Sequence, residues 1–220
     1  MRVTFDDIVK NERLKAYIRK GNEVLGVLGY TDHSHNHTMR VAETAAGILS
    51  GFGRDERTVE LTRIAGYMHD IGNMVNRAQH PLTGAVIAFT ILTDMGMDAE
   101  EIADVVSAVG NHDEGLGEPV SPIAAALIIA DKTDVRRSRV RNANNLTFDI
   151  HDRVNYAVVG SDLDVDNGAQ TITLKLQIDD SICPVIDYFE IFLSRMLMCK
   201  RAAEFLGAKF KLIINGAAIL

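Results

Sequence analysis

The 220-residue sequence contains only two cysteines, and no apolar stretch in it approaches the length that spans a membrane. Its net charge is -7, so the chain lacks the basic footprint of a general nucleic-acid-binding protein. No charged, apolar and small-residue signal is recognisable at the N-terminus. These absences favour a cytoplasmic protein with neither a membrane nor a nucleic acid as a general partner.

The two cysteines do not indicate a disulfide. Cys183 and Cys199 fall within one predicted helix, where sixteen residues separate them by about 24 Å at about 1.5 Å per residue. That distance is too long for a disulfide, and neither residue has metal-ligand spacing with a nearby His or Cys. We expect free, buried thiols, which fit a reducing compartment.

The composition is that of a chain with a full hydrophobic core. Hydrophobic residues make up 47% of the sequence, enough for one domain with an appendage. The pattern changes from helical to alternating near residue 145. We therefore predict a helical domain over residues 1–145 and a small α+β appendage over residues 146–220, packed on it.

The dipeptide His69-Asp70 is the most informative feature of the chain. It ends an apolar helical run and is followed at once by Ile71-Gly72. Adjacent side chains on a helix point about 100° apart, so they share one metal only where the helix ends against other elements. A single His-Asp pair is common by chance, and its meaning depends on the residues that accompany it.

Four further candidate ligands lie at or near the ends of separate apolar helical segments. In the segment from Asp32 to Leu49, apolar residues recur every four positions and place one histidine on the core-facing stripe. Asp98 with Glu101, and Ser121 with Pro122, predict the starts of the two later helices. His37 lies in the first of these segments, and His112 and Asp131 lie at the ends of the two later ones. The fourth candidate, His80, lies in the sequence between them.

Buried imidazoles and carboxylates are costly unless they are paired or bind metal. Four histidines and two aspartates exceed the needs of one tetrahedral ion and suit two divalent ions bridged by Asp70. Iron, manganese, zinc and nickel are all compatible with these ligand types. The predicted metal ligands are His37, His69, Asp70, His80, His112 and Asp131.

With these motifs the chain resembles the HD superfamily of metal-dependent phosphohydrolases over roughly residues 30 to 140. The resemblance rests on His37 with the following Arg40-Val41-Ala42, on His69-Asp70 and on Asp131. His80 with Gly84, and His112 with the glycines after it, match the two-metal branch. The resemblance implies a mainly α-helical HD-domain bundle. To this bundle the sequence pattern adds an appendage of antiparallel strands and one long helix.

Within that branch the stretch from His80 to Arg137 is similar to symmetrical diadenosine tetraphosphate hydrolases and, more distantly, to HD-GYP phosphodiesterases. It departs from the second group at Asn73, where a lysine is usual, and at Asn111, which replaces the first of a histidine pair. No Gly-Tyr-Pro triplet is present. The sequence therefore does not favour a cyclic dinucleotide as substrate.

The expected chemistry is hydrolysis by a metal-activated water, with Asp70 as the bridging catalytic carboxylate. His33 lies four residues before His37 and is expected on the same helical face, where it could bind an extra metal, donate a proton to the leaving group or contact phosphate. Arg40, Lys132 and Arg137 are the candidate substrate-binding residues, because guanidinium and ammonium groups suit phosphate oxygens.

The region after residue 145 shows strand and helix patterns. Residues 170–178 alternate strictly, and Asn167-Gly168 before them predicts a hairpin turn. A long helix is expected from about Pro184 to Leu206, with Gly207 as its stop, and a third strand at residues 210–214. We expect this appendage to be a lid or a surface for homo-oligomer formation; the alternative is that it shapes the substrate pocket.

Taken together, the sequence predicts a metal-dependent phosphohydrolase that cleaves a phosphate mono- or diester of a nucleotide or another small molecule. Two other functions remain open at this level. One is a di-iron oxygenase on the same fold, and the other is a non-catalytic regulatory module stabilised by metal. Fold-level similarity does not choose among them.

Overall fold

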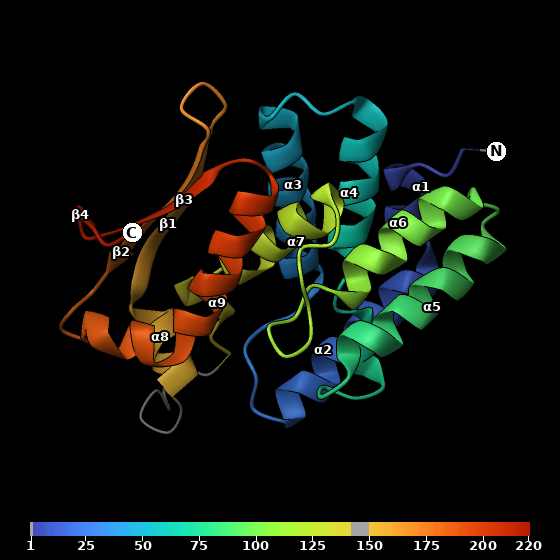
Figure 1. Ribbon diagram of the computed structural model, residues 1–220. Coiled ribbons are helices and arrows are strands. Elements are labelled where there is room, and N and C mark those ends of the chain that lie inside the picture. The colour runs from blue at the N-terminus through green and yellow to red at the C-terminus, as the bar shows by residue number, and fades with distance from the viewer. Residues whose placement is uncertain (1, 142–149) are drawn as a thin grey trace.

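A computed structural model describes residues 2–141 and 150–220 (Figure 1). Helices α3 to α7 form a bundle, and α1 and α2 pack beside it at the N-terminus. The helical part up to residue 141 comprises α1 (Phe5–Lys10), α2 (Glu12–Val27), α3 (His35–Gly51), α4 (Glu56–Met68), the 3-10 turn η1 (Ile71–Met74), α5 (His80–Asp94), α6 (Ala99–Gly110), α7 (Pro122–Lys132) and the 3-10 turn η2 (Arg137–Arg139).

The helix starts follow the capping residues in the sequence. Asp98 accepts a hydrogen bond from Glu100 N at the start of α6, and Ser121 accepts one from Ala124 N at the start of α7. The prediction that Glu101 joins Asp98 in capping the start of α6 was wrong for Glu101. The Glu101 carboxylate accepts instead from Arg57 Nε on α4 at 2.6 Å, because this ion pair joins two neighbouring helices.

Two glycines let the helices approach closely enough to bring their ends together. A Cβ on Gly66 of α4 would lie 2.6 Å from the Cα of Ala42 on α3, so only glycine permits this contact. A Cβ on Gly72, in η1, would lie 2.0 Å from His80 O, the first carbonyl of α5. The end of α4 and the start of α5 therefore meet at this glycine.

We expect Gly72→Ala to lower the free energy of unfolding by about 1–3 kcal/mol or more, because the added methyl overlaps the start of α5. Gly47→Ala is the matched control, since Gly47 is an exposed glycine of α3 whose Cβ would meet nothing within 4 Å. That variant should gain about 0.5–1 kcal/mol from helix propensity. Urea unfolding measures both, and equal effects of the two substitutions would contradict the close contact at Gly72.

The C-terminal part is a four-stranded sheet covered by two helices, in the order β1-β2-β3-β4. Its elements are α8 (Ile150–Ala157), β1 (Val158–Asp166), β2 (Thr171–Ile178), α9 (Val185–Phe205), β3 (Lys209–Ile214) and β4 (Ala217–Ala218). The hairpin, the long helix and the third strand are confirmed. One pairing differs from the expected antiparallel arrangement: β2 and β3 are parallel, because α9 crosses over between them.

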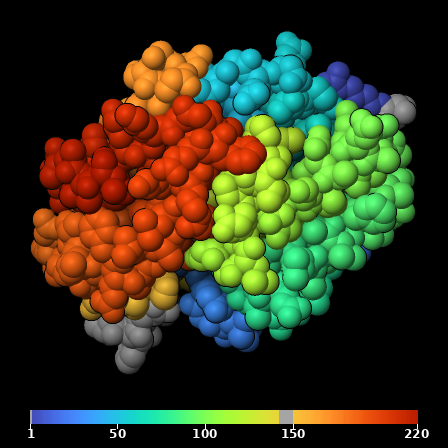
Figure 2. Space-filling view, in the orientation of Figure 1, coloured from blue at the N-terminus to red at the C-terminus, as the bar shows by residue number. Residues whose placement is uncertain are grey.

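Helix α9 connects the sheet to the helical bundle by packing on α7 (Figure 1). Figure 2 shows the segment that follows α6 lying against the C-terminal part of the chain. Two ion pairs join these surfaces, Arg195 to Glu114 at 2.9 Å and Arg201 to Glu118 at 3.6 Å. The appendage is thus held against the loop that carries His112.

Both thiols are free and buried, as predicted. Their expected placement in one helix was wrong, because α9 begins at Val185 and Cys183 lies before it. Among the described residues, no helix combines the length and apolarity needed to cross a membrane.

Candidate metal centre

All six predicted ligands meet at one place, where five helices of the bundle come together. His37 lies on α3, and His69 and Asp70 directly follow α4. The three remaining ligands come from α5, the residues after α6, and the last turn of α7; they are His80, His112 and Asp131. All four imidazoles are at most 2% exposed, so the cluster is sealed from bulk solvent on most sides.

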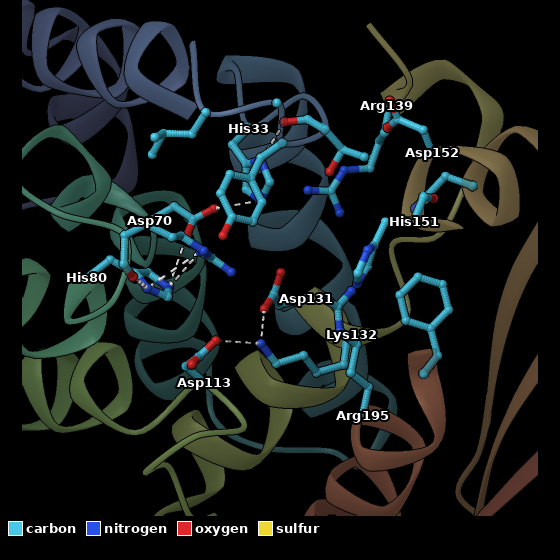
Figure 3. Close-up of a pocket in the computed structure, with 17 residues that line it drawn as sticks. His33, Asp70, His80, Asp113, Asp131, Lys132, Arg139, His151, Asp152 and Arg195 are labelled. Carbon is cyan, nitrogen blue, oxygen red and sulfur yellow. Dashed lines mark hydrogen bonds and ion pairs between the residues drawn. The ribbon is translucent and has the colours of Figure 1, made fainter. Parts of the chain in front are cut away.

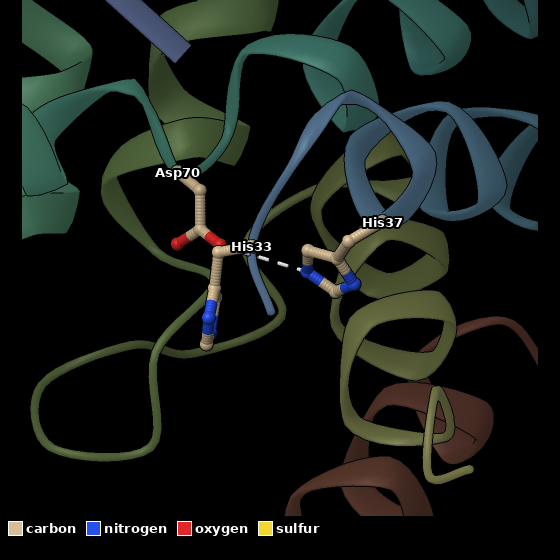
Figure 4. Close-up of side chains that lie close together, drawn as sticks. All are labelled: His33, His37 and Asp70. Carbon is tan, nitrogen blue, oxygen red and sulfur yellow. Dashed lines mark ion pairs between the residues drawn. The ribbon is translucent and has the colours of Figure 1, made fainter. Parts of the chain in front are cut away.

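The Asp70 carboxylate lies in the middle of this cluster. Its Oδ2 is 3.5 Å from His37 Nε2 (Figure 4) and 3.2 Å from His69 Nε2. Its Oδ1 is 3.4 Å from His80 Nε2. The two oxygens therefore face different imidazoles, which is the placement that a bridging carboxylate requires.

Asp131 and His112 complete the two sides. Asp131 Oδ1 lies 3.4 Å from His37 Nε2 and 3.6 Å from His69 Nε2. On the other side, the Nε2 atoms of His80 and His112 are 3.1 Å apart. Ligand atoms that lie within 4.8 Å of one another group as His37, His69 and Asp131, as His69, Asp70 and His112, and as His33, His37 and Asp70.

Each imidazole in the cluster is oriented through its Nδ1 atom. Nδ1 of His37 bonds Asp134 Oδ2 at 2.7 Å. The other Nδ1 atoms bond backbone carbonyls at 2.7–2.9 Å, namely His33 to Thr31, His69 to Gly66, His80 to Arg77 and His112 to Val109. A ring nitrogen that faces a carbonyl oxygen carries the hydrogen, so the Nε2 lone pairs point into the cluster as metal ligands do.

Three atoms at the centre have no hydrogen-bond partner although they are buried. They are Nε2 of His37, Nε2 of His69 and Oδ2 of Asp70. Buried polar atoms are normally satisfied, and a metal ion held among these three would satisfy all of them. The donor set of imidazole nitrogens and carboxylate oxygens fits a divalent transition metal.

The electrostatics of the cluster also call for positive charge at its centre. Burial opposes a charged His69, yet Asp70 and Asp131 overcome it and raise the pKa of His69 to about 10. Burial would raise the pKa of Asp70, but the surrounding imidazoles hold it well below its ordinary value. Burial lowers the pKa of His33, His80 and His112, which keeps these rings in the neutral form that binds metal.

The cluster opens into a cavity of about 280 Å³ between the bundle and the C-terminal helices (Figure 3). His33, Asp70, His80 and Asp131 reach it from the bundle. The side chains that reach it from α8 and α9 are His151, Asp152, Asn155, Phe192 and Arg195. The cavity is lined by four cations, Arg77, Lys132, Arg139 and Arg195.

His33 reaches the site by a different route from the expected one. Helix α3 begins at His35 after the cap Ser34, so His33 is not on the helical face of His37. The preceding loop nevertheless places its Nε2 3.9 Å from Asp70 Oδ2. His35, for which we predict no role, is exposed, and its Nδ1 lies 3.0 Å from Tyr67 Oη.

The three predicted substrate-binding cations are not together. Arg40 points to the far side of His37, where its Nε lies 3.1 Å from Asp134 Oδ1, and it does not line the cavity. Arg137 also does not line it, because its Nε donates to Tyr156 O and its guanidinium lies over the Tyr156 ring. Lys132 lines the cavity, with its Nζ 2.8 Å from Asp131 Oδ2 and 2.7 Å from Glu114 Oε2. Lys132 thus orients Asp131.

Sequence reasoning missed several residues of the site. Asp134 follows Asp131 by three residues, just after the end of α7, and this spacing was a usable signal. Arg77 lies in the short segment between the candidate ligands Asp70 and His80, and this position was a second usable signal. Nothing in the local pattern pointed to His151 or Arg195, because only the fold brings α8 and α9 to the cavity.

The segment that contains the six candidate ligands matches a known protein family. Residues 35–136 match the HD domain model. The match begins at the first residue of α3 and ends shortly after α7, so the matched residues include all six metal-ligand candidates. The sheet and α9 lie outside the matched residues.

Two individual proteins are similar to this chain. MJ1020 of Methanocaldococcus jannaschii is 30% identical over 163 residues, which is 64% of this chain and 62% of that protein. The chain thus spans less than two thirds of that relative's length. The crystal structure of a predicted HD superfamily hydrolase from an uncultured Thermotogales bacterium is 26% identical, with a TM-score of 0.45, over 56% of this chain and 67% of that one.

Proposed function

We propose that this protein is a phosphohydrolase that uses two divalent metal ions to cleave a small phosphate ester. The observation that supports it best is the buried cluster of unpaired Nε2 and carboxylate atoms facing a cavity with four cationic side chains. Metal ligands alone would serve many reactions. The surrounding positive charge favours an anionic substrate, and guanidinium groups suit phosphate oxygens.

The metal positions follow from the ligand groups. His37, His69 and Asp131 would hold one ion, and His80 and His112 the other, with Asp70 between them. Bound metals of this kind lower the pKa of a coordinated water and polarise phosphoryl oxygens. Iron, manganese, zinc and nickel remain the candidates, since imidazole with carboxylate accommodates each of them.

The remaining residues have roles that their contacts suggest. Asp134 orients His37 through Nδ1, and Lys132 holds the outer oxygen of Asp131. Arg77, whose Nη1 lies 4.0 Å from Asp70 Oδ1, is placed to contact phosphate. His33 lines the cavity. Its ring is neutral when no anion is bound, and a phosphate bound beside it would favour the protonated form, which could give a proton to the leaving group.

The size of the cavity bears on the substrate. At about 280 Å³ it is at the lower end of ligand pockets, which span roughly 300–1,000 Å³. This supports a small phosphate ester in preference to a dinucleotide. A mononucleotide or a sugar-sized phosphate is the largest substrate that we propose.

The test is an ester-hydrolysis assay on protein reconstituted separately with each candidate metal, in which inorganic phosphate is measured for monoesters and the released alcohol for diesters. The panel should include small phosphate monoesters, nucleoside monophosphates and diesters, with oxygen uptake followed in parallel. We expect metal-dependent release of phosphate or alcohol from at least one ester and no oxygen uptake. Two bound ions with no release from any ester would overturn the proposal, and oxygen uptake by an iron-loaded protein would favour the oxygenase.

His33→Gln should lower kcat by about 100-fold while the metal content and the fold stay unchanged, if His33 donates a proton to the leaving group. The loss should be larger for an alkyl phosphate than for p-nitrophenyl phosphate, whose leaving group needs no proton. His35→Gln is the control, because His35 does not line this cavity. Loss of metal from His33→Gln would make His33 a ligand, and equal losses for both substrates would remove its role as an acid.

A further inference from the structure

We propose that Arg195, together with Arg139, forms a second anion-binding subsite in the cavity, and that the substrate carries a second anionic group besides the phosphate bound at the metals. The proposal rests on the proposed function for the identity of the first group. The subsite itself rests on the contacts of Arg195 and on its position.

Arg195 is held in a fixed orientation. Its Nε donates to Glu114 Oε1 at 2.9 Å, and its guanidinium carbon lies 4.7 Å from the centre of the Phe192 ring. These contacts use the Nε edge and one face of the group. The terminal nitrogens, the pair that forms a fork for carboxylate or phosphate oxygens, make no hydrogen bond to the described residues.

Arg195 comes from the opposite side of the cavity to the metal ligands. Figure 3 shows His33, Asp70 and His80 on the bundle side and Arg195 on the side of α8 and α9. A group bound to Arg195 would therefore lie across the cavity from a phosphate at Asp70. One substrate with two separated anionic groups would satisfy both ends.

Arg139 is a second cation that lines the same cavity. It is 5% exposed, and its Nε and Nη1 donate to the backbone carbonyls of Asp32 and Asp134. Burial lowers the pKa of Arg139, and the smaller effect of the Arg195 charge acts in the same direction, while Asp134, Asp131 and Asp70 oppose the shift. Two cations that repel each other in a partly closed cavity are stabilised by an anion between them.

The acidic side chains that line the cavity do not use up the hydrogen-bonding capacity of Arg195. Its acids are Asp70, Asp113, Asp131 and Asp152. The first and third of these would bind the metals, and Asp113 lies 3.5 Å from Lys132 Nζ. Arg195 is already paired with Glu114, yet that contact takes only its Nε edge. The chemistry is thus that of a phosphate ester with a carboxylate or a second phosphate several bonds away.

The experiment uses compounds that cannot be hydrolysed at phosphorus. Calorimetry on the metal-loaded protein would compare methylphosphonate with phosphonoacetate, 3-phosphonopropionate and 4-phosphonobutyrate, which place a carboxylate at three increasing distances. In the unmodified protein at least one of the three should bind about 10-fold or more tightly than methylphosphonate, since a charged hydrogen bond contributes that much. In Arg195→Gln this ratio should fall to less than about threefold.

Arg201→Gln is the matched control, because Arg201 lies on the same helix with its side chain 48% exposed and should leave the ratio unchanged. Thermal melting shows whether Arg195→Gln is folded at the assay temperature. If it is not, Arg195→Lys replaces it; lysine keeps a charge beside Glu114 but lacks the fork, so the ratio should still fall at least about threefold.

The outcomes separate the two proposals. If methylphosphonate binds and the ratio is the same in Arg195→Gln as in the unmodified protein, the subsite is overturned and the proposed function stands. If methylphosphonate binds and no carboxylate improves on it, the second anionic group is overturned. If no phosphonate binds to the metal-loaded protein, both proposals fail.

Discussion

Replacement of Asp70 by alanine should remove most of the bound metal and lower kcat/KM by on the order of 10⁴-fold or more. The reason is that both Asp70 oxygens face imidazole Nε2 atoms, so one substitution disturbs both metal positions. Without the metals, water at neutral pH is a weak nucleophile, because its pKa returns from about 7 toward 15.7. Metal analysis and turnover on the same sample measure the two effects.

Asp94→Ala is the control for this substitution. Asp94 ends α5 and pairs with Arg13 at the surface, where its side chain is 55% exposed. Loss of such a pair typically costs little, so metal content and turnover should not change. An Asp70→Ala protein with native metal content and turnover would make Asp70 a structural residue and would contradict the bridging role.

Removal of the metals from the unmodified protein should lower its thermal midpoint by roughly 8–16 °C. A ligand present at a thousandfold excess over its Kd stabilises the folded state by about 4 kcal/mol, and each kcal/mol corresponds to about 2–4 °C for a chain of this size. The physical cause is the set of buried, unpaired ligand atoms that the ions would satisfy. Scanning calorimetry before and after chelation, and after metal is returned, gives the shift.

Asp70→Ala is also informative in this second experiment. Its midpoint should barely respond to added metal, because the central ligand is absent. A midpoint of the unmodified protein that does not move on chelation, with metal loss verified by elemental analysis, would show that the cluster is stable as an ion-pair network. That result would contradict the claim that bound metal stabilises the folded protein.

The ligand positions were predictable because each one is marked locally. His37 falls on the apolar stripe of its helix, and His69-Asp70 stands at a helix end followed by a glycine. The structure explains why that glycine is needed, since the start of α5 leaves no room for a Cβ at Gly72. Helix periodicity and helix-end signals were thus sufficient to place the cluster.

The cavity was much less predictable, because its far wall depends on tertiary packing. Arg195 is one charged residue on an amphipathic helix, and its sequence neighbours do not distinguish it from Arg201. Arg40 looked suitable because it is close to His37 in sequence, but one turn of helix directs it to Asp134. Arg195 reaches the cavity because α9 packs on the bundle, and the sequence pattern contains no information about that packing.

The strand directions show the same limit. Residues 170–178 and 210–214 were recognisable as strands by their alternation. Their parallel pairing follows from the crossover through α9 and its packing on α7. Alternation reports burial of one strand face and contains no information about the direction of the neighbouring strand.

The most direct test of the two-metal centre is a crystal structure of metal-loaded protein with anomalous scattering data, combined with elemental analysis of the same preparation. Two anomalous peaks per chain are predicted, one among His37, His69 and Asp131 and the other beside His80 and His112, with Asp70 between them. A single peak bound only by His37, His69, Asp70 and Asp131, with one metal ion per chain in solution, would contradict the account.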